Sequence, residues 1–408
     1  MKRDTLGGEQ PPPFSMVDNA AIQAARTRIE GLIKRTPLLY SDSFSHLFGG
    51  PIYLKAENLQ RTGSFKIRGA SNKLAQLTAE QSARGVITAS AGNHAQGVAL
   101  AASLRGVACT VVMPETASLA KYEATVGYGA TVELCGANFE GALARAQQLA
   151  RERGLIFIPA FDDEDVVAGQ GTVGLEILDD LPDAGLVIVP VGGGGLSAGI
   201  STAVKALHPG MRVVGVQSAA APSTFDSFHA DHVVPRPPKP TIADGIAVGK
   251  AGEIPVDLLR KHLDDMVVVD DESIAHAIVL LMERSKMLVE PAGAVGLAAL
   301  LAGAVNTEGA KTAIVLSGGN LDIALLARIV EHGLSFAGRY LMLQATLEDR
   351  PGELARLAGV HRRAEGQRGR RGAPPHGPAS RRRAGGGPVD AGGAQPGTRG
   401  GGHAAATR

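Results

Sequence analysis

The stretch KAENLQRTGSFKIRGA, residues 55–70, combines a glycine turn with a lysine that opens a helix. Gly63 and Ser64 are predicted to end a loop, so that Phe65 and Lys66 stand at the start of the helix. A lysine in that position, beside an aromatic ring, can lose part of its hydration, which lowers its pKa and makes its amine a usable nucleophile. Most lysines are solvated surface charges, so this interpretation depends on the segments around the stretch.

The chain on either side of this stretch alternates between helical and strand patterns. Residues 18–34 begin with a capping aspartate and place apolar residues on one face, which predicts a helix that ends before Pro37. Short apolar runs then recur, each followed by a glycine-rich or polar turn and a helical stretch. The runs are 85–88, 109–113, 131–134, 186–191, 213–216 and 313–316. Because such runs are typical of strands buried on both faces, they predict parallel sheets covered by helices, in two α/β lobes with a cleft between them.

Composition and charge narrow the class of protein. The 408 residues are enough for two or three domains, and 44% hydrophobic and 20% charged residues are ordinary for a soluble globular protein. Residues 361–408 hold ten arginines and two acidic residues. Residues 1–360 therefore hold 31 basic and 38 acidic residues, so this main part of the chain is mildly acidic. That balance gives no reason to expect a nucleic acid or membrane partner. We find neither a signal peptide nor an apolar run of about 18 residues, so we expect a cytoplasmic protein.

The segment SFKIRGA, residues 64–70, closely resembles the lysine segment of the threonine/serine dehydratase (threonine ammonia-lyase) family of fold-type II pyridoxal-phosphate enzymes. The resemblance extends over about residues 17–335. It implies a two-lobed α/β fold with parallel sheets, similar to tryptophan synthase β, and pyridoxal 5'-phosphate held by Lys66 with Phe65 beside it. The implied domains are a large cofactor-binding domain, residues 17–60 and 156–335, and a small domain, residues 61–155.

A second segment, SAGNHAQG at residues 90–97, lies between a predicted strand and a predicted helix. Backbone N–H groups at such a helix start form a natural seat for an anion. In the family this loop takes the substrate carboxylate, and its asparagine donates to the ring hydroxyl of the cofactor. The resemblance therefore implies substrate binding by Ser90, Ala91, Gly92, Asn93 and His94, with Asn93 also binding the cofactor. A plain helix cap is the alternative for Ser90 or Asn93 alone.

A third segment, VGGGGL at residues 191–196, directly follows the strongest buried strand. Four glycines let the backbone approach a phosphate without side-chain clash and aim several N–H groups at it. The resemblance implies that the cofactor is bound by Gly192, Gly193, Gly194, Gly195 and Leu196. A dinucleotide site is the alternative, but it requires an acidic residue about 20 positions further on, where Gln217 stands.

A fourth segment, SGGN at residues 317–320, again follows a buried strand. In the family the serine hydroxyl faces the pyridine nitrogen, so the resemblance gives Ser317 that role. A hydroxyl cannot keep a proton on the ring nitrogen as a carboxylate would, which favours loss of a β-substituent over transamination. Two supporting segments, TIADG at residues 241–245 and EPAG at residues 290–293, also resemble family segments that line the cleft. They imply that Gly245 and Glu290 contact the cofactor. Ordinary loop and helix-cap roles are the alternative.

The resemblance as a whole implies β-elimination that converts L-threonine into 2-oxobutanoate and ammonia, and L-serine into pyruvate, with Lys66 and Ser317 as catalytic residues. Amino-acid racemisation is the nearest alternative, but related racemases need a hydroxyl where this chain has Ala91. They also bind a divalent ion through an acid where Gln217 stands, and no histidine has metal-ligand spacing, so we expect no metal. A protein that binds the cofactor without catalysis is a second class of alternative. The family also implies a homodimer or homotetramer.

A third unit is predicted to begin at Arg339. Its pattern resembles the opening of an ACT regulatory domain, and residues 339–360 are assigned to a fragment of that domain. The pattern consists of a strand at 340–346, a loop at 348–352 and the first turns of a helix at 353–357. A complete ACT domain would need two further strand–helix rounds, so we expect allosteric control to be absent or damaged.

Residues 361–408 break this pattern abruptly. They contain 13 glycines, ten arginines and a single large aliphatic residue, Val389. Such a segment cannot bury enough apolar surface to offset its ordering entropy, so it is predicted to be disordered. A reading frame lost near residue 360 explains the break better than a natural basic tail that binds nucleic acid.

Overall fold

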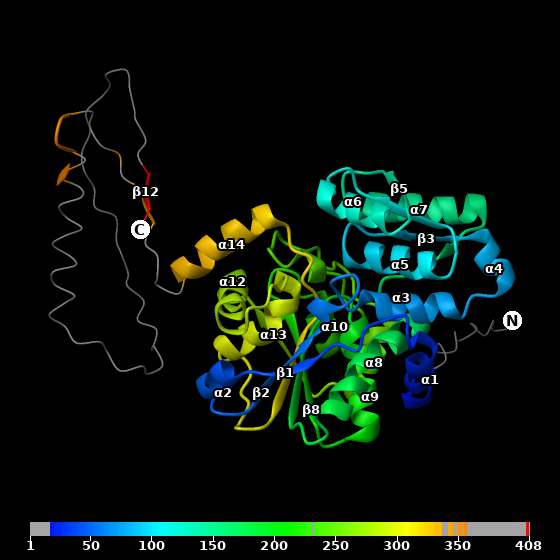
Figure 1. The fold of residues 1–408 in the computed structure, drawn as a ribbon, viewed down its shortest axis with the longest axis horizontal. Helices are drawn as coiled ribbons and strands as arrows, with labels where there is room; N and C mark the ends of the chain where they lie inside the picture. Colours follow the sequence, from blue (N-terminus) through cyan, green and yellow to red (C-terminus); the bar gives the residue numbers. More distant parts are fainter. Residues whose placement is uncertain are drawn as a thin grey trace, which may run out of the picture. The chain divides into compact units, whose positions relative to one another are not determined.

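A six-stranded sheet forms the centre of the larger lobe, in the order β1-β2-β10-β7-β8-β9 (Figure 1). Its strands are β1 (Leu38–Tyr40), β2 (Ile52–Ala56), β7 (Leu186–Pro190), β8 (Arg212–Ser218), β9 (Asp265–Val269) and β10 (Thr312–Leu316). All neighbours pair in parallel except β1 and β2. Every residue of the central strands β7 and β10 is buried, as their apolar runs predicted. The predicted α/β class with parallel sheets is confirmed.

The computed structural model describes residues 17–230, 232–336, 342–344, 346, 350–353, 355–356 and 405–407. The described residues up to 336 form one unit, and those from 342 onward form a second. The helices of the first unit are α1 (Asn19–Ile29), α2 (Asp42–Phe48), α3 (Lys66–Ala75), α4 (Ala79–Arg84), α5 (Asn93–Leu104), α6 (Leu119–Gly127), α7 (Phe139–Arg153), α8 (Glu164–Asp180), α9 (Gly195–Leu207), α10 (Ser223–His229), α11 (Glu253–His262), α12 (Asp271–Leu280), α13 (Pro291–Leu301) and α14 (Ile323–Phe336). Short 3-10 turns η1 (Glu57–Leu59) and η2 (Asp244–Ile246) and a π-helical turn η3 (Leu281–Ser285) complete it. Helices α8, α9 and α11 cover one face of the sheet, and α12 and α13 cover the other.

A smaller, fully parallel sheet of four strands has the order β5-β4-β3-β6. Its strands are β3 (Val86–Ala89), β4 (Cys109–Met113), β5 (Thr131–Leu134) and β6 (Ile156–Phe157). The predicted large domain includes residue 156, but β6 pairs with β3 of the smaller sheet, and the amide of Ile158 extends the ladder to Ile87 O at 2.9 Å. Only two residues make this strand, so its run was too short to be recognised in the sequence.

Helix α1 is shorter than the sequence predicted. Asp18 caps it by accepting from the amide of Ala21 at 2.8 Å, and its apolar face is buried as expected. The helix ends at Ile29, however, and does not continue to residue 34. Gly31 adopts φ +74°, a left-handed conformation that a helix cannot include, so the chain turns before the predicted end.

The second unit holds two short strands, β11 (Met342–Gln344) and β12 (Ala405–Thr407), which pair antiparallel. The strand predicted at 340–346 is therefore three residues long in the described part of the chain. Residues 405–407 lie within the segment 361–408, which is predicted to be disordered, and they are the part of it that the structure describes. The rest of the segment 361–408 lies outside the described residues.

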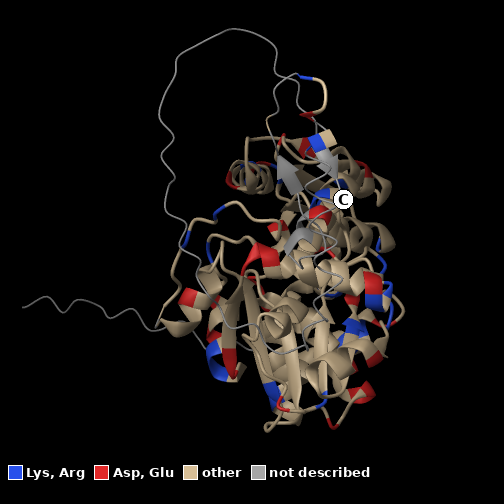
Figure 2. Cartoon of the chain, turned by 90° about the vertical axis from the view of Figure 1, so that its left-hand side faces the viewer, with Lys and Arg blue, Asp and Glu red and all other residues tan. Residues whose placement is uncertain are grey.

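Charged residues of both signs are interspersed over the side of the molecule that Figure 2 shows, with no extended patch of one sign. Most strand residues in that view are uncharged, which agrees with their burial. Within the part of the chain that the structure describes, no helix is both long and apolar enough to cross a membrane.

Candidate active site

Lys66 is the first residue of α3, as predicted. Its Nζ donates to the carbonyl oxygen of Ala160 at 2.9 Å and lies 5.2 Å from the centre of the Phe65 ring. Although the residue as a whole is only half-buried, loss of solvent around the amine lowers its pKa to about 8, and the charge of Glu290 opposes that shift. The amine can therefore lose its proton near neutral pH, which a proton acceptor requires.

The Ser317 segment lies against the Lys66 segment. Ser317 is buried, and its carbonyl oxygen accepts from the amide of Phe65 at 3.1 Å. Ser64 and Gly318 form an isolated antiparallel bridge beside this bond. Two motifs that are about 250 residues apart in the sequence are thus joined through their backbones.

Asn93 begins α5 and is held from two sides. Its Oδ1 accepts from Nδ2 of Asn320 at 2.7 Å, and its Nδ2 donates to Oε1 of Glu290, also at 2.7 Å. The bond from Asn320 fixes which way the Asn93 amide faces. Asn320 also donates to the Thr62 carbonyl oxygen at 2.7 Å, so it ties the loop before Lys66 to the loop before α5.

The remainder of the 90–94 loop is a tight turn. Ser90 Oγ accepts from the amide of Gly92 at 3.1 Å, and Ala91 is half-buried. His94 is buried, and its Nε2 lies 3.1 Å from the carbonyl oxygen of Ile158. Burial lowers the pKa of His94 to about 3, and the charge of Lys66 adds to this effect, so the ring is neutral. Its side chain is already bonded to the backbone at Ile158.

Glu290 occupies the N-cap position of α13, where Pro291 follows it. It is 7% exposed, and burial, followed by the charge of Asp244, raises its pKa to about 7. A side chain on Gly318 would meet Glu290 Oε1 at 2.2 Å, and one on Gly245 would meet Ala292 at 3.0 Å. A Cβ on Gly245 would also lie 3.9 Å from Glu290 Oε1, so Gly245, Glu290 and Gly318 are packed together.

The glycine loop links the end of β7 to α9. A side chain on Gly193 would meet the ring of Phe161 at 2.5 Å, and Gly194 adopts φ +96°. Among the described residues, no acceptor is found for the amide N–H groups of residues 192–195. A Cβ on Gly192 would lie 3.2 Å from Ile246, so the loop also borders Gly245. Four consecutive free N–H groups at a helix start make a seat for an anion.

Two residues of this site were missed in the sequence. Asn320 is the last residue of the SGGN motif, and its place in that motif was the sequence signal that could have identified it as a site residue. Phe161, which packs against Gly193 and Gly195, lies in a segment with no motif.

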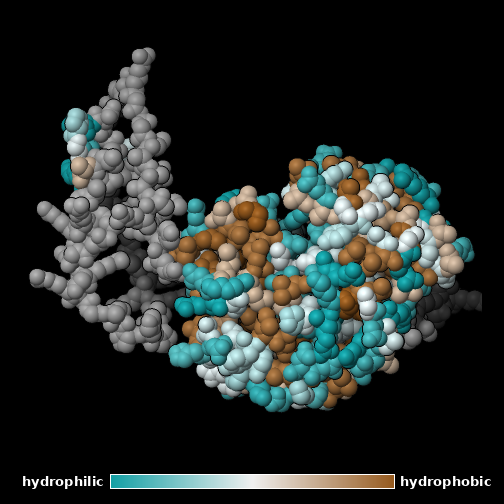
Figure 3. Space-filling view, viewed as in Figure 1, coloured by the Kyte–Doolittle hydropathy of each residue, from teal (hydrophilic) through white to brown (hydrophobic). Residues whose placement is uncertain are grey.

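A cavity of about 310 Å³ opens beside the candidate substrate loop, where the surface is hollowed between α6 and α14 (Figure 3). Its lining includes Ala91 of the loop and the ion pair between Lys121 Nζ and Asp244 Oδ2, 3.0 Å apart. That pair joins the two lobes, because Lys121 belongs to α6 and Asp244 to η2.

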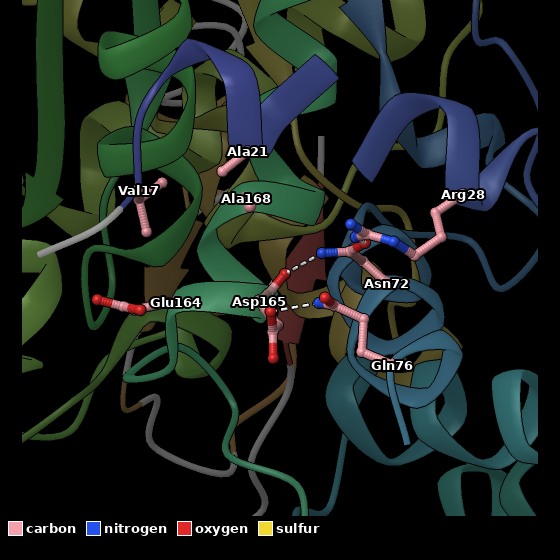
Figure 4. A pocket seen from close by; sticks show the side chains of 8 residues that line it. All are labelled: Val17, Ala21, Arg28, Asn72, Gln76, Glu164, Asp165 and Ala168. Atoms are coloured by element: carbon pink, nitrogen blue, oxygen red, sulfur yellow. Dashed lines mark hydrogen bonds between the residues drawn. The ribbon is translucent and has the colours of Figure 1, made fainter. Parts of the chain in front are cut away.

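Another cavity, of about 190 Å³, lies between α1, α3 and α8 and contains none of the predicted site residues (Figure 4). Its polar groups already bind one another: Asn72 Nδ2 donates to the Asp165 carbonyl oxygen at 2.7 Å, and Gln76 bonds the Asp165 carboxylate. Within the described residues, no group of three or more His, Cys, Asp or Glu side chains is placed to hold a metal ion.

Comparison with known proteins agrees with this geometry. Residues 29–318 match the family described as pyridoxal-phosphate dependent enzyme. L-threonine ammonia-lyase of Geobacter sulfurreducens is 52% identical over 84% of this chain and 85% of its own length. The solved structure of maize serine racemase is 35% identical with a TM-score of 0.74, covering 79% of this chain and 99% of that one. The structure of the processed form of threonine deaminase isoform 2 from Solanum lycopersicum is 36% identical with a TM-score of 0.72, covering 77% and 86%.

Proposed function

This chain belongs to the pyridoxal-phosphate-dependent enzyme family, and from that premise we propose how its residues carry out the reaction of a threonine ammonia-lyase. The enzyme converts L-threonine into 2-oxobutanoate and ammonia. Water is lost from the substrate and taken up again when the released enamine hydrolyses, so the net reaction neither consumes nor produces it. One observation supports the assignment of roles above all: a chain of contacts connects the three motifs. Asn320 ties the loop before Lys66 to Asn93, and Asn93 donates to Glu290. A Cβ on Gly245 would lie 3.9 Å from Glu290 Oε1, and Gly192 of the glycine loop packs against the neighbouring Ile246.

The residues present fit the cofactor. The N–H groups of residues 192–195 would hold its phosphate. The amine of Lys66 would bond its aldehyde carbon. Among the described residues, that amine has only the Ala160 carbonyl as a hydrogen-bond partner. Asn93 would donate to its ring hydroxyl and Ser317 would face its ring nitrogen. When bound, pyridoxal phosphate withdraws electrons from Cα of the amino acid, which makes the Cα proton removable.

The chain supplies orientation and proton transfer. The N–H groups at the start of α5 would bind the substrate carboxylate. Lys66 would take the proton from Cα, since its pKa of about 8 lets a substantial fraction of its amine be neutral at the pH of the cell. Ser317, as a hydroxyl, would not keep a proton on the ring nitrogen as a carboxylate would, which would favour rapid loss of the β-hydroxyl.

Turnover of L-threonine tests this function. We expect the purified protein, supplied with pyridoxal phosphate, to release 2-oxobutanoate and ammonia in equal amounts, and L-serine to give pyruvate. Protein stripped of cofactor should release neither until the cofactor is restored. Cofactor binding without any loss of threonine would contradict the proposal and favour a binding protein without catalysis.

The same incubation separates elimination from racemisation, since serine racemase structures are among the similar folds. We expect chiral analysis of L-serine incubated with the enzyme to show no D-serine. Ala91 carries a methyl group where racemisation requires a proton donor on the second face of the substrate. Accumulation of D-serine at a rate comparable to that of pyruvate would make the racemase assignment the better one.

The proposal extends to the setting of the enzyme. We place it in the cytoplasm, as a homodimer or homotetramer, in threonine breakdown or isoleucine synthesis. Composition and family resemblance support these points.

Glu290 predicts a pH dependence of stability. Its pKa of about 7 in the folded protein exceeds the ordinary value of 4.5, so the folded state keeps a proton that the unfolded chain loses. The resulting stabilisation is complete below pH 4.5 and is lost as the pH rises through 7. We expect this loss, about 3 kcal/mol, in the cofactor-free protein and not in Glu290→Gln, measured by denaturant unfolding at several pH values.

The exposed Glu115 offers a matched control. Glu115→Gln should keep the pH dependence of the wild type, because that carboxylate is solvated in both states. If Glu290→Gln and the wild type lose stability in parallel between pH 5 and pH 7.5, Glu290 does not hold the proton.

A further inference from the structure

The carbonyl oxygen of Gly192 is held by two buried side chains. Thr224 Oγ1 donates to it at 2.5 Å, and Gln217 Nε2 donates at 3.4 Å. Both side chains are fully buried, with 0% exposure. Neither residue belongs to the motifs that carry the cofactor roles, since Gln217 lies on β8 and Thr224 on α10.

The direction of this carbonyl sets the direction of the next N–H group. No cis peptide bond occurs in the described residues, and in a trans peptide the C=O of one residue and the N–H of the next point in opposite directions within the peptide plane. Because Thr224 and Gln217 hold the Gly192 oxygen on their side, the N–H of Gly193 points away from them. That N–H is one of the four without an acceptor among the described residues.

A run of four glycines cannot fix this peptide by itself. Glycine reaches more backbone conformations than any other residue, so ordering the loop at the moment of binding would weaken affinity. The following peptide, 193–194, is held separately, because the Gly193 carbonyl accepts from the amide of Gly252 at 3.2 Å. Among the described residues, the 192–193 peptide is held by the two side-chain donors to the Gly192 carbonyl.

Gln217 also positions Thr224. Its Oε1 accepts from the amide of Phe225 at 2.8 Å, which is the peptide directly after Thr224. A single buried amide therefore fixes both the glycine loop and the start of the helix that carries the threonine. The two residues act as one unit on the Gly192 carbonyl.

We propose that Thr224 and Gln217 are positioning residues for the anion seat, and that they hold the Gly193 N–H toward the phosphate of the cofactor before it binds. This inference rests on the proposed function, because it takes the glycine loop as the phosphate site. It predicts that their loss weakens binding of a phosphorylated cofactor and leaves binding of its dephosphorylated form unchanged.

The test compares pyridoxal phosphate with pyridoxal, which carries the same aldehyde and ring but no phosphate. Each is titrated into cofactor-free enzyme, and its dissociation constant is read from the absorbance of the bound form. In Thr224→Val we expect pyridoxal phosphate to bind about tenfold more weakly, as loss of one good hydrogen bond implies, with pyridoxal changed less than about twofold. Thr224→Ser, which keeps the hydroxyl, should restore the affinity for pyridoxal phosphate.

Thr202→Val is the matched control, because the buried Thr202 hydroxyl has no hydrogen-bond partner among the described residues. It should bind both probes as the wild type does. If Thr224→Val does not fold, Gln217→Met removes the second donor together with the acceptor that holds the peptide after Thr224, and it should show the same selective loss.

Three outcomes would overturn the inference. Equal affinity of Thr224→Val and the wild type for pyridoxal phosphate would show that the donors do not prepare the seat. Equal losses for both probes would show a merely structural role. A wild type that binds pyridoxal no more weakly than pyridoxal phosphate would remove the glycine loop as the phosphate site, and would count against the proposed function itself.

Discussion

Replacing Lys66 by alanine abolishes the formation of 2-oxobutanoate from L-threonine. We expect a loss of at least about a thousandfold, since the variant lacks both the amine that holds the cofactor and the base that takes the Cα proton. The absorbance of the covalently held cofactor should disappear together with the activity. The free energy of unfolding of the cofactor-free protein should not fall. Burial of the charged amine costs free energy, as its pKa of about 8 shows, and the methyl group of alanine does not have that cost.

Lys73 provides the control from the same helix. It lies near the end of α3, and its Nζ pairs with Asp163 and Asp165 at 2.7 and 2.9 Å, away from the candidate site. Lys73→Ala should retain the cofactor absorbance and most of the activity. Retention of activity within tenfold of the wild type in Lys66→Ala would remove Lys66 from the mechanism.

Much of this site could be predicted from the sequence because its parts are local. The lysine stands at a helix start, the glycines follow a buried strand, and each pattern involves fewer than ten consecutive residues. The carboxyl ends of parallel strands lie at one edge of a sheet, which is why the motifs after the neighbouring strands β7 and β10 begin at the same edge. Fold class and the general location of the site follow from such local signals.

Contacts between distant side chains could not be predicted in this way. Nothing near Phe161 indicates that its ring fills the space beside Gly193, and nothing near Thr224 indicates that its hydroxyl reaches the Gly192 carbonyl. These contacts depend on how the lobes and layers pack. The end of α1 was missed for a different reason, since the apolar spacing continues beyond Gly31 although the backbone does not remain helical.

The opening stretch also contains a buried charge network that its sequence does not reveal. Arg68 follows Lys66 by two residues on α3 and has 0% exposure. Its guanidinium donates to both carboxylate oxygens of Glu57, at 2.9 and 2.8 Å, and to both of Glu176, at 2.7 and 2.9 Å. Lys55 Nζ donates to Glu176 at 2.6 Å. Two cations and two carboxylates are thus enclosed together, and Glu176 comes from α8, more than 100 residues further along the chain.

The network balances its own charges. Burial alone would lower the pKa of Arg68, but the carboxylates of Glu57 and Glu176 outweigh burial and raise it. Burial would likewise raise the pKa of Glu176, and the charges of Arg68 and Lys55 outweigh that effect and lower it. Removing one member therefore leaves its partners buried without the opposite charge that they contact.

Arg68→Met therefore destabilises the protein by about 4 kcal/mol, the cost of leaving buried carboxylates without their main partner. Denaturant unfolding of the cofactor-free protein measures the change at neutral pH. Adding Glu57→Gln to Arg68→Met should recover part of the stability, because the double variant no longer contains that stranded carboxylate.

The ion pair between Arg26 and Asp179 is the matched control, because it has the same chemistry at the surface. Arg26 Nη2 lies 2.5 Å from Asp179 Oδ2, and the two side chains are 41% and 39% exposed. Arg26→Met should change the free energy of unfolding by less than about 1 kcal/mol, since solvent stabilises the carboxylate that remains. Similar losses in Arg68→Met and Arg26→Met would mean that burial of the network contributes nothing. A large loss in Arg68→Met alone, partly restored by Glu57→Gln, would show that the charges behind Lys66 hold α3 in place as a unit.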